Sequence, residues 1–226
     1  MDTSGLIRGL YAITRDTPDL NKLILQVRQA IAGGASIVQY RNKRSSNDLA
    51  RMQAQALRAV THASGTLFIV NDDIDLAFSV GADGVHIGRD DGDAGTIARI
   101  REQCPLRAPS TSFTIGVSCY NELKRAETAV AAGADYIAFG SFFSSPTKPH
   151  AIKADLALIG AAKAEFDVPI VAIGGITIDN AQQLISAKVD ALAVISALFD
   201  AEDIAQRARE FNNLFKCGNH VYLPQQ

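Results

Sequence analysis

The sequence has few cysteines, no long apolar run and no excess of basic residues, and each of these absences excludes a class of protein. The cysteines at positions 104, 119 and 217 form neither a C-x-x-C pair nor part of a histidine ladder, so free thiols in a reducing compartment are expected. No apolar run reaches transmembrane length, and residues 1–8 lack the apolar core of a signal peptide, which predicts a cytoplasmic protein without a membrane partner. A formal net charge of -2 argues against binding nucleic acid irrespective of sequence.

Short apolar runs rich in β-branched residues recur along the whole chain. Between them, apolar residues at helical spacing, such as Leu20, Leu23 and Val27, predict amphipathic helices, and Ser45 and Ser46 suit the cap of one helix. Because predicted strands and helices strictly alternate, the strands should form a parallel sheet. The predicted strands are 9–14, 36–41, 66–72, 84–88, 114–119, 136–142, 169–175 and 191–197.

Eight strands in a chain of 226 residues favour a closed (β/α)8 TIM barrel. An open doubly wound sheet is the main alternative, but no G-x-G-x-x-G motif follows the first predicted strand. A composition with 47% hydrophobic residues allows one large core. We therefore expect a single α/β domain over residues 1–226, with the barrel over roughly 9–215 and an irregular tail over 216–226.

A short motif is repeated ahead of several predicted strands. It reads Gly33-Gly34-Ala35-Ser36, Gly81-Ala82-Asp83-Gly84 and Gly133-Ala134-Asp135-Tyr136. Glycine at this place ends a helix and allows a tight turn into the next strand. The corresponding fourth segment, Lys188-Val189-Asp190-Ala191, lacks the glycine, and the sequence alone does not explain why.

The active site of a (β/α)8 barrel lies at the carboxyl ends of its strands, so the residues there are the candidates for function. At the end of the second predicted strand, Gln39, Arg41 and Lys43 alternate with other residues and would project to one side of an extended chain. Two cations and an amide on the inner side of a barrel predict an anion site, most plausibly for phosphate. An exposed edge strand with ordinary surface charges is the alternative.

Acidic residues follow the third and fourth predicted strands. Two carboxylates from neighbouring strand ends, close to a phosphate site, are a typical magnesium site, and Asp72 and Asp91 are the candidates. Asp73 is better explained as a helix cap. For Asp91 and the adjacent Asp90, a solvated turn is an equally good reading of the sequence.

The remaining strand ends predict further anion contacts. Ser118 ends the fifth strand, where it could also cap a helix, and the loop after the sixth strand is rich in hydroxyl groups and stiffened by proline. Glycine and serine at the ends of strands seven and eight suit a phosphate monoester held by backbone N–H groups. The loop residues are Ser145, Pro146, Thr147 and Lys148, and the monoester site comprises Gly175, Ile195 and Ser196.

The sequence offers no nucleophile. No serine or cysteine has a paired histidine and carboxylate, so covalent catalysis is not supported. His86 lies within the fourth predicted strand and is better explained as a buried, hydrogen-bonded histidine than as a general base. Cys119 is better explained as a small core residue.

Taken in order, these motifs resemble those of the thiamine-phosphate synthases, and the resemblance covers roughly residues 9–200. The chain departs from the family pattern in having Asn at position 42, Cys119-Tyr120 after Ser118, and Ser144-Ser145 in the loop. The matching motifs are Gln39-Tyr40-Arg41-x-Lys43, Val70-Asn71-Asp72, Gly84-Val85-His86-Ile87-Gly88, Gly116-Val117-Ser118, Gly174-Gly175-Ile176 and Ile195-Ser196.

The resemblance implies an enzyme with two small phosphorylated substrates. It would join 4-amino-2-methyl-5-hydroxymethylpyrimidine diphosphate to 4-methyl-5-(2-hydroxyethyl)thiazole phosphate and release diphosphate. It implies Mg²⁺ at Asp72 and Asp91. The implied pyrimidine diphosphate contacts are Gln39, Tyr40, Arg41, Asn42, Lys43, Asn71, Ser118 and Lys148, and the implied thiazole phosphate contacts are Ser145, Pro146, Thr147, Gly175, Ile195 and Ser196.

Catalysis would consist mainly of neutralising the charge on the departing diphosphate. Mg²⁺, Arg41, Lys43 and Lys148 would supply the neutralising positive charge, and Ser118 is the fourth side chain predicted to be catalytic. Since no protein nucleophile is present, a dissociative route through a pyrimidine-stabilised cation is the expected mechanism. A thiazole tautomerase-like paralogue, a thiazole phosphate-binding regulator and another phosphosugar enzyme are the alternatives, and the sequence leaves the oligomeric state open.

Overall fold

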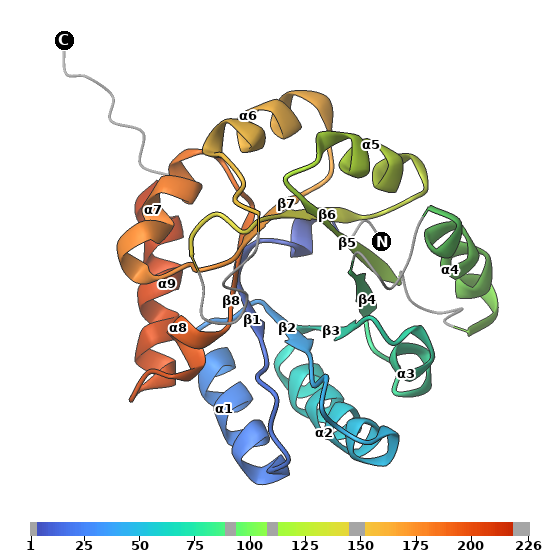
Figure 1. The fold of residues 1–226 in the computed structure, drawn as a ribbon. Helices are drawn as coiled ribbons and strands as arrows, with labels where there is room; N and C mark the ends of the chain where they lie inside the picture. Colours follow the sequence, from blue (N-terminus) through green and yellow to red (C-terminus); the bar gives the residue numbers. More distant parts are fainter. Residues whose placement is uncertain (1–3, 89–93, 108–112, 145–151, 219–226) are drawn as a thin grey trace.

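Eight parallel strands close into a barrel in the computed structural model, which describes residues 4–88, 94–107, 113–144 and 152–218. Each strand pairs with its neighbours in the sequence, and β1 pairs with β8 to complete the ring (Figure 1). The predicted (β/α)8 barrel is thus confirmed. The strands are β1 Gly9–Ile13, β2 Ile37–Tyr40, β3 Leu67–Asn71, β4 Gly84–Ile87, β5 Thr114–Tyr120, β6 Tyr136–Phe139, β7 Ile170–Ile173 and β8 Ala191–Val194.

Helices surround the barrel and follow the strands in alternation (Figure 1). Ser46 caps α2 by accepting a hydrogen bond from the Leu49 N–H, and Asp73 caps α3 in the same way through the Leu76 N–H, as expected from the sequence. The helices are η1 Ser4–Leu6, α1 Leu20–Ala32, α2 Asn47–Ser64, α3 Ile74–Ser79, α4 Ala94–Arg107, α5 Leu123–Ala131, α6 Leu156–Glu165, α7 Ile178–Ser186, α8 Ser196–Phe199 and α9 Ile204–Gly218.

The last helix is longer than the sequence suggested. An irregular tail was expected from residue 216, but α9 continues through Gly218, which places Lys216 in helix. The stripe that includes Ile204, Ala208 and Phe211 is buried against the rest of the domain, because these side chains are at most 5% exposed. Residues 219–226 lie outside the described part of the chain.

The hydrophobic core has two layers, one inside the barrel and one between the strands and the helices. Most residues of the short strands are buried, as is usual for a parallel sheet that is covered on both faces. The inner layer is small and contains two tyrosines. Its members are Ile7, Tyr11, Ile13, Ile37, Ile69, Tyr136, Ala138, Val171, Ala191 and Ala193.

Aspartates tie the strands together at the amino ends of the barrel. Asp135, just before β6, accepts a hydrogen bond from the Ile115 N–H at 2.6 Å and forms an ion pair with Arg101 of α4. Two further ties of the same kind join Asp83 to the Phe68 N–H and Arg58, and Asp190 to the Ile170 N–H and Lys163. The repeated motif of the sequence therefore has a structural role at the amino ends of the strands, and the carboxyl ends form the opposite opening of the barrel, its mouth.

Lys188 takes the place of the missing glycine in the fourth copy of this motif. Its φ of 74° matches the left-handed conformation of Gly34, Gly81 and Gly133 in the other copies. The turn is thus retained although the residue type differs. A side chain with a Cβ atom is strained in this region, so the lysine carries a conformational cost.

We expect Lys188→Gly to raise the free energy of unfolding by roughly 0.5–1 kcal/mol, because glycine removes the Cβ contact that strains this turn. Lys188 is exposed, so no packing is lost. Urea unfolding of the two proteins measures the difference. Lys188→Ala is the matched control, since alanine keeps the Cβ atom; an equal gain for both variants would contradict strain as the cause.

Candidate functional site

The segment that follows β2 is held by the end of β1. β2 ends at Tyr40, so the alternating comb expected from the sequence does not continue as strand beyond that residue. Instead, the Thr14 hydroxyl accepts a hydrogen bond from the Arg41 backbone N–H at 2.9 Å and donates one to the Arg41 carbonyl at 3.1 Å. Asp16 accepts hydrogen bonds from the Lys43 N–H at 3.1 Å and from the Arg41 guanidinium at 3.4 Å. Thr14 and Asp16 therefore fix the backbone of this segment, and Asp16 also positions the Arg41 guanidinium.

The sequence interpretation missed Asp16. A signal was available, because Asp16 follows a predicted strand just as Asp72 does. The ion pairs of Asp16 with Arg41 and Arg44 show that this carboxylate gathers positive charge beside the mouth of the barrel.

The residues from 39 to 42 do not all face the mouth. Gln39 is 2% exposed and donates a hydrogen bond to the Tyr11 hydroxyl at 2.7 Å inside the barrel. Tyr40 points outward, with its hydroxyl donating to the Gln53 Oε1 atom of α2 at 2.8 Å, and the Asn42 amide donates to the same oxygen at 3.0 Å. Because the side chains of Tyr40 and Asn42 face α2, their predicted substrate contacts could involve only the backbone.

Lys43 and Asp72 meet at the carboxyl ends of the adjacent strands β2 and β3. The Lys43 ammonium lies 3.2 Å from the Asp72 carboxylate, whose side chain is 17% exposed. That carboxylate also accepts hydrogen bonds from the Asn71 side-chain amide and, at 3.1 Å, from the Gly88 N–H at the end of β4. These contacts place the predicted metal ligand Asp72, the predicted substrate ligand Asn71 and one predicted cation in a single cluster.

Asp72 has an unusual backbone conformation. Its φ of 62° lies in the left-handed region, which an aspartate adopts at a cost. Strained residues of this kind persist where the surrounding structure fixes them, and they concentrate at functional sites. Here the Asp72 N–H donates to the His86 carbonyl at 2.9 Å, so β4 holds the residue in place.

The cluster fits a magnesium ion that takes most of its ligands from phosphate and water. Asp72 supplies a hard carboxylate oxygen at the mouth, and its pairing with Lys43 shows that the position attracts a cation. No group of three or more His, Cys, Asp or Glu side chains that could hold a metal occurs among the described residues. A fully protein-bound ion is therefore not indicated there, and the second predicted ligand, Asp91, lies outside the described residues.

The loop after β6 was predicted to contribute several contacts. Its candidates Ser145, Pro146, Thr147 and Lys148 also lie outside the described residues, so their predicted roles stay predictions. The loop is described up to Ser144, and its first part packs against the end of β7.

Ser118 and His86 meet at the ends of β5 and β4. The Ser118 hydroxyl lies 2.9 Å from the Nε2 atom of His86, which is 7% exposed, so the expected buried, hydrogen-bonded histidine is confirmed. The adjacent Cys119 is fully buried, as expected for a core residue, and burial raises the pKa of its thiol to about 12. Because a thiol with this pKa stays protonated at neutral pH, Cys119 is a poor nucleophile.

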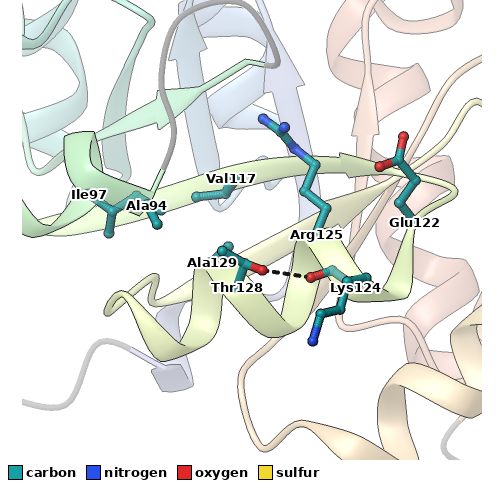
Figure 2. A pocket seen from close by; sticks show the side chains of 8 residues that line it. All are labelled: Ala94, Ile97, Val117, Glu122, Lys124, Arg125, Thr128 and Ala129. Carbon is teal, nitrogen blue, oxygen red and sulfur yellow. Dashed lines mark hydrogen bonds between the residues drawn. The ribbon is translucent and has the colours of Figure 1, made fainter.

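Arg125 holds the ends of β4 and β5 from outside the barrel. Its guanidinium donates to the Ser118 carbonyl at 2.8 Å and to the Gly88 carbonyl at 3.3 Å. Figure 2 shows Arg125 extending toward β5 while the ammonium of Lys124 points away. The pocket drawn there, about 300 Å³, lies between α4 and α5 and is therefore separate from the mouth. Sequence reasoning missed Arg125 because a helical arginine has no distinctive pattern.

Close packing explains the glycines after β7. Gly174 and Gly175 have φ values of 100° and 66°, and a Cβ atom on Gly175 would lie 2.4 Å from the Ser144 carbonyl oxygen. The turn and its packing therefore already require glycine at these positions. The Asn180 amide donates to the Gly175 carbonyl at 3.0 Å, which fixes the turn at the start of α7.

The short helix α8 begins directly after β8. Ile195 is its N-cap and Ser196 its first residue. In (β/α)8 barrels a short extra helix in this place, together with the loops after strands seven and eight, frequently binds phosphate. Gly175, Ile195 and Ser196 thus lie at the strand ends where the sequence predicted a monoester site.

The barrel, with charged and polar side chains gathered at the carboxyl ends of its strands, defines a (β/α)8-barrel enzyme. The family described as thiamine monophosphate synthase matches residues 10–198. The chain belongs to this family.

Individual relatives agree with this assignment. A thiamine-phosphate synthase of Thiobacillus denitrificans is 51% identical over 209 residues, which are 92% of this chain and 94% of that protein. A thiamine-phosphate synthase of Methylobacillus flagellatus is also 51% identical, over 92% of this chain and 96% of its own. The solved thiamine phosphate pyrophosphorylase from Pyrococcus furiosus has a TM-score of 0.82 and 33% identity, covering 96% of this chain and 98% of its own.

No helix within the described residues is long and apolar enough to cross a bilayer.

Proposed function

We propose that this chain is a thiamine-phosphate synthase that joins 4-amino-2-methyl-5-hydroxymethylpyrimidine diphosphate to 4-methyl-5-(2-hydroxyethyl)thiazole phosphate. The observation that carries the proposal is the cluster of Lys43, Asp72 and Asn71 at the mouth, with Arg41 held beside it by Asp16. An isomerase or binding protein for a monophosphate has little need for this set of charges. The relatives named as thiamine-phosphate synthases support the same activity.

The diphosphate group binds beside Arg41 and Lys43. Both cations lie on a segment fixed by Thr14 and Asp16, so little reorganisation is needed when negative charge develops on the leaving group. Lys43 is 53% exposed and can turn from Asp72 to the substrate without losing a buried contact. Lys148 adds a further cation from the loop after β6.

Asp72 and Asp91 would hold Mg²⁺. The ion, when bound, supplies positive charge that stabilises the departing diphosphate. Asn71 orients the Asp72 carboxylate through its side-chain amide, and the Gly88 N–H fixes the other carboxylate oxygen.

The thiazole phosphate binds at the ends of β7 and β8. Backbone N–H groups near Gly175 and at the start of α8, together with the Ser196 hydroxyl, suit a phosphate monoester. Ser145, Pro146 and Thr147 belong to the loop that would complete this site. The two anion sites occupy separate strand ends, as two phosphorylated substrates require.

The carbon–oxygen bond breaks before the thiazole nitrogen attacks. Two observations on the described residues favour this dissociative order. The Cys119 thiol stays protonated, and Ser118, although it lies 2.9 Å from His86 Nε2, is not part of a triad, because a tyrosine hydroxyl and not a carboxylate faces His86 Nδ1. Electron-withdrawing substituents on the pyrimidine should then slow turnover steeply, as single-turnover measurements on a substrate series would reveal. A flat response would rule the route out.

Diphosphate release tests the activity itself. Purified protein should release diphosphate when both substrates and Mg²⁺ are present, and a chelator should stop the release. Binding of thiazole phosphate without any release of diphosphate would instead support a regulator or a tautomerase-like paralogue. The free thiols Cys104 and Cys119 fit an enzyme that works in the reducing cytoplasm.

A further inference from the structure

A chain of hydrogen bonds crosses the inside of the barrel and ends at two residues assigned above to the pyrimidine substrate. It begins at Gln39 on β2 and ends at Ser118 on β5. The successive distances are 2.7 Å from Gln39 Nε2 to the Tyr11 hydroxyl, 2.8 Å to the Tyr136 hydroxyl, 2.9 Å to His86 Nδ1, and 2.9 Å from His86 Nε2 to the Ser118 hydroxyl.

The middle of this chain is deeply buried. Tyr11 and Tyr136 are at most 1% exposed, and their rings pack edge to face among aliphatic side chains of the inner core. Polar groups in such a place cost free energy unless every one is hydrogen-bonded. Phenylalanine and an aliphatic residue would fill the same volume without that requirement, so the hydroxyl groups need an explanation beyond packing.

The barrel is built around the Tyr136 hydroxyl. Gly116 lies beside it on β5, and a Cβ atom there would come within 1.9 Å of Tyr136 Cζ and 2.3 Å of its hydroxyl oxygen. The ring of His86, on β4, stacks with the ring of Tyr136, and the two ring centroids lie 5.6 Å apart. These neighbours leave the phenol one position, between Tyr11 and His86.

A single direction of donation can run along the whole chain. Burial raises the pKa of both tyrosines above the ordinary value, so each hydroxyl keeps its proton and has one hydrogen to donate. One consistent direction, with Gln39 donating to Tyr11, has Tyr11 donating to Tyr136 and Tyr136 donating to His86 Nδ1, and we adopt this direction. In this direction His86 carries a proton on Nε2 and donates it to Ser118.

This direction gives the two ends opposite hydrogen-bonding character. The Gln39 side-chain oxygen is left to accept a hydrogen bond, and the Ser118 hydroxyl proton is left to donate one. An aminopyrimidine ring presents the complementary pair, an amino group that donates and a ring nitrogen that accepts.

We propose that His86 and Tyr136 are positioning residues that, through Tyr11, orient the Gln39 amide and the Ser118 hydroxyl for recognition of the aminopyrimidine ring. This role rests on the proposed function, since it assigns the pyrimidine to the mouth of the barrel. It concerns the ring alone, because none of the chain's members is among the cations that face the diphosphate.

Tyr136→Phe removes one hydroxyl. It should weaken recognition of the pyrimidine ring and leave binding of the diphosphate group unchanged. Calorimetry should give an affinity for the pyrimidine diphosphate about tenfold lower, from the loss of buried hydrogen bonds, and an affinity for inorganic diphosphate within twofold of the unmodified protein. In a protein that already carries Ser118→Ala, Tyr136→Phe should lower the affinity for the pyrimidine diphosphate less than twofold, because both substitutions interrupt the same chain of hydrogen bonds. Thr61→Val is the matched control, since it removes a buried hydroxyl on α2 that bonds only to backbone carbonyls.

Equal losses for both ligands, or additive effects of the two substitutions, would overturn the positioning role. Nitrogen NMR of His86 in the unmodified protein tests it without any variant: the neutral Nε2–H form is expected, and a neutral Nδ1–H form would contradict the chain direction. If the unmodified protein binds inorganic diphosphate but not the pyrimidine diphosphate, the proposed function fails instead.

Discussion

Asp72→Asn is expected to reduce diphosphate release at least 100-fold while leaving the fold intact. The substitution removes the carboxylate charge that faces Lys43 and the proposed magnesium position, and loss of one well-placed electrostatic group at a reacting centre costs about 10²–10³ in rate. Steady-state diphosphate release with both substrates measures the effect. The concentration of Mg²⁺ needed for half-maximal activity should rise in the same variant.

Asparagine is the informative replacement because it preserves the structure around position 72. Asparagine tolerates the left-handed backbone conformation, with φ of 62°, better than alanine does, and its side-chain oxygen can still accept from the Gly88 N–H. The melting temperature should therefore change little. Asp75→Asn is the matched control, since Asp75 is 87% exposed and pairs with Arg107 on the surface. Turnover of Asp72→Asn within threefold of the unmodified protein would contradict the assignment.

Asp135→Ala is expected to lower the free energy of unfolding by about 2–3 kcal/mol, or roughly 5–10 °C in melting temperature for a domain of this size. The substitution leaves the buried Ile115 N–H without its acceptor. It also takes from Arg101 its ion-pair partner, although Arg101 keeps hydrogen bonds to the Gly133 and Phe113 carbonyls. Because the pair is partly exposed, most of the loss should come from the unsatisfied N–H.

Asp135→Asn separates the two contributions. The amide oxygen still accepts from Ile115, so this variant should lose only about 1 kcal/mol. Asp167→Ala, at an exposed position, controls for the removal of a carboxylate. Calorimetric measurement of thermal unfolding gives the loss of stability for each of the three variants. A loss in Asp135→Ala no larger than that of the control would show that the tie contributes nothing measurable.

The sequence predicted the barrel and part of the site because both depend on local patterns. Each apolar run marks a strand, and the polar residues immediately after a run mark the strand end. Asn71, Asp72 and Ser118 were found in this way. Helix caps such as Ser46 and Asp73 were also predictable, because a cap acts within one turn of chain.

Contacts between distant segments were not predictable. The hydrogen bond from Tyr11 to Tyr136 joins residues 125 positions apart, and nothing in the sequence near either residue indicates the other. The departure of Arg41 and Lys43 from strand geometry has a similar cause, since Thr14 and Asp16, in the segment after β1, impose it. The alternation of residues 39–43 predicts that Tyr40 and Asn42 face away from Gln39, Arg41 and Lys43, but it gives no indication of their shared partner, Gln53 on α2.

The aspartate ties and the reacting groups lie at opposite ends of the same strands. β4, for example, runs four residues from Gly84, next to Asp83, to Ile87, next to Gly88, which is a length of about 13 Å. Substitutions more than about 7–10 Å apart without shared partners usually have additive effects. Substitutions at the amino ends of the strands, such as the one at Lys188, should therefore change the melting temperature of this enzyme and leave its turnover unchanged.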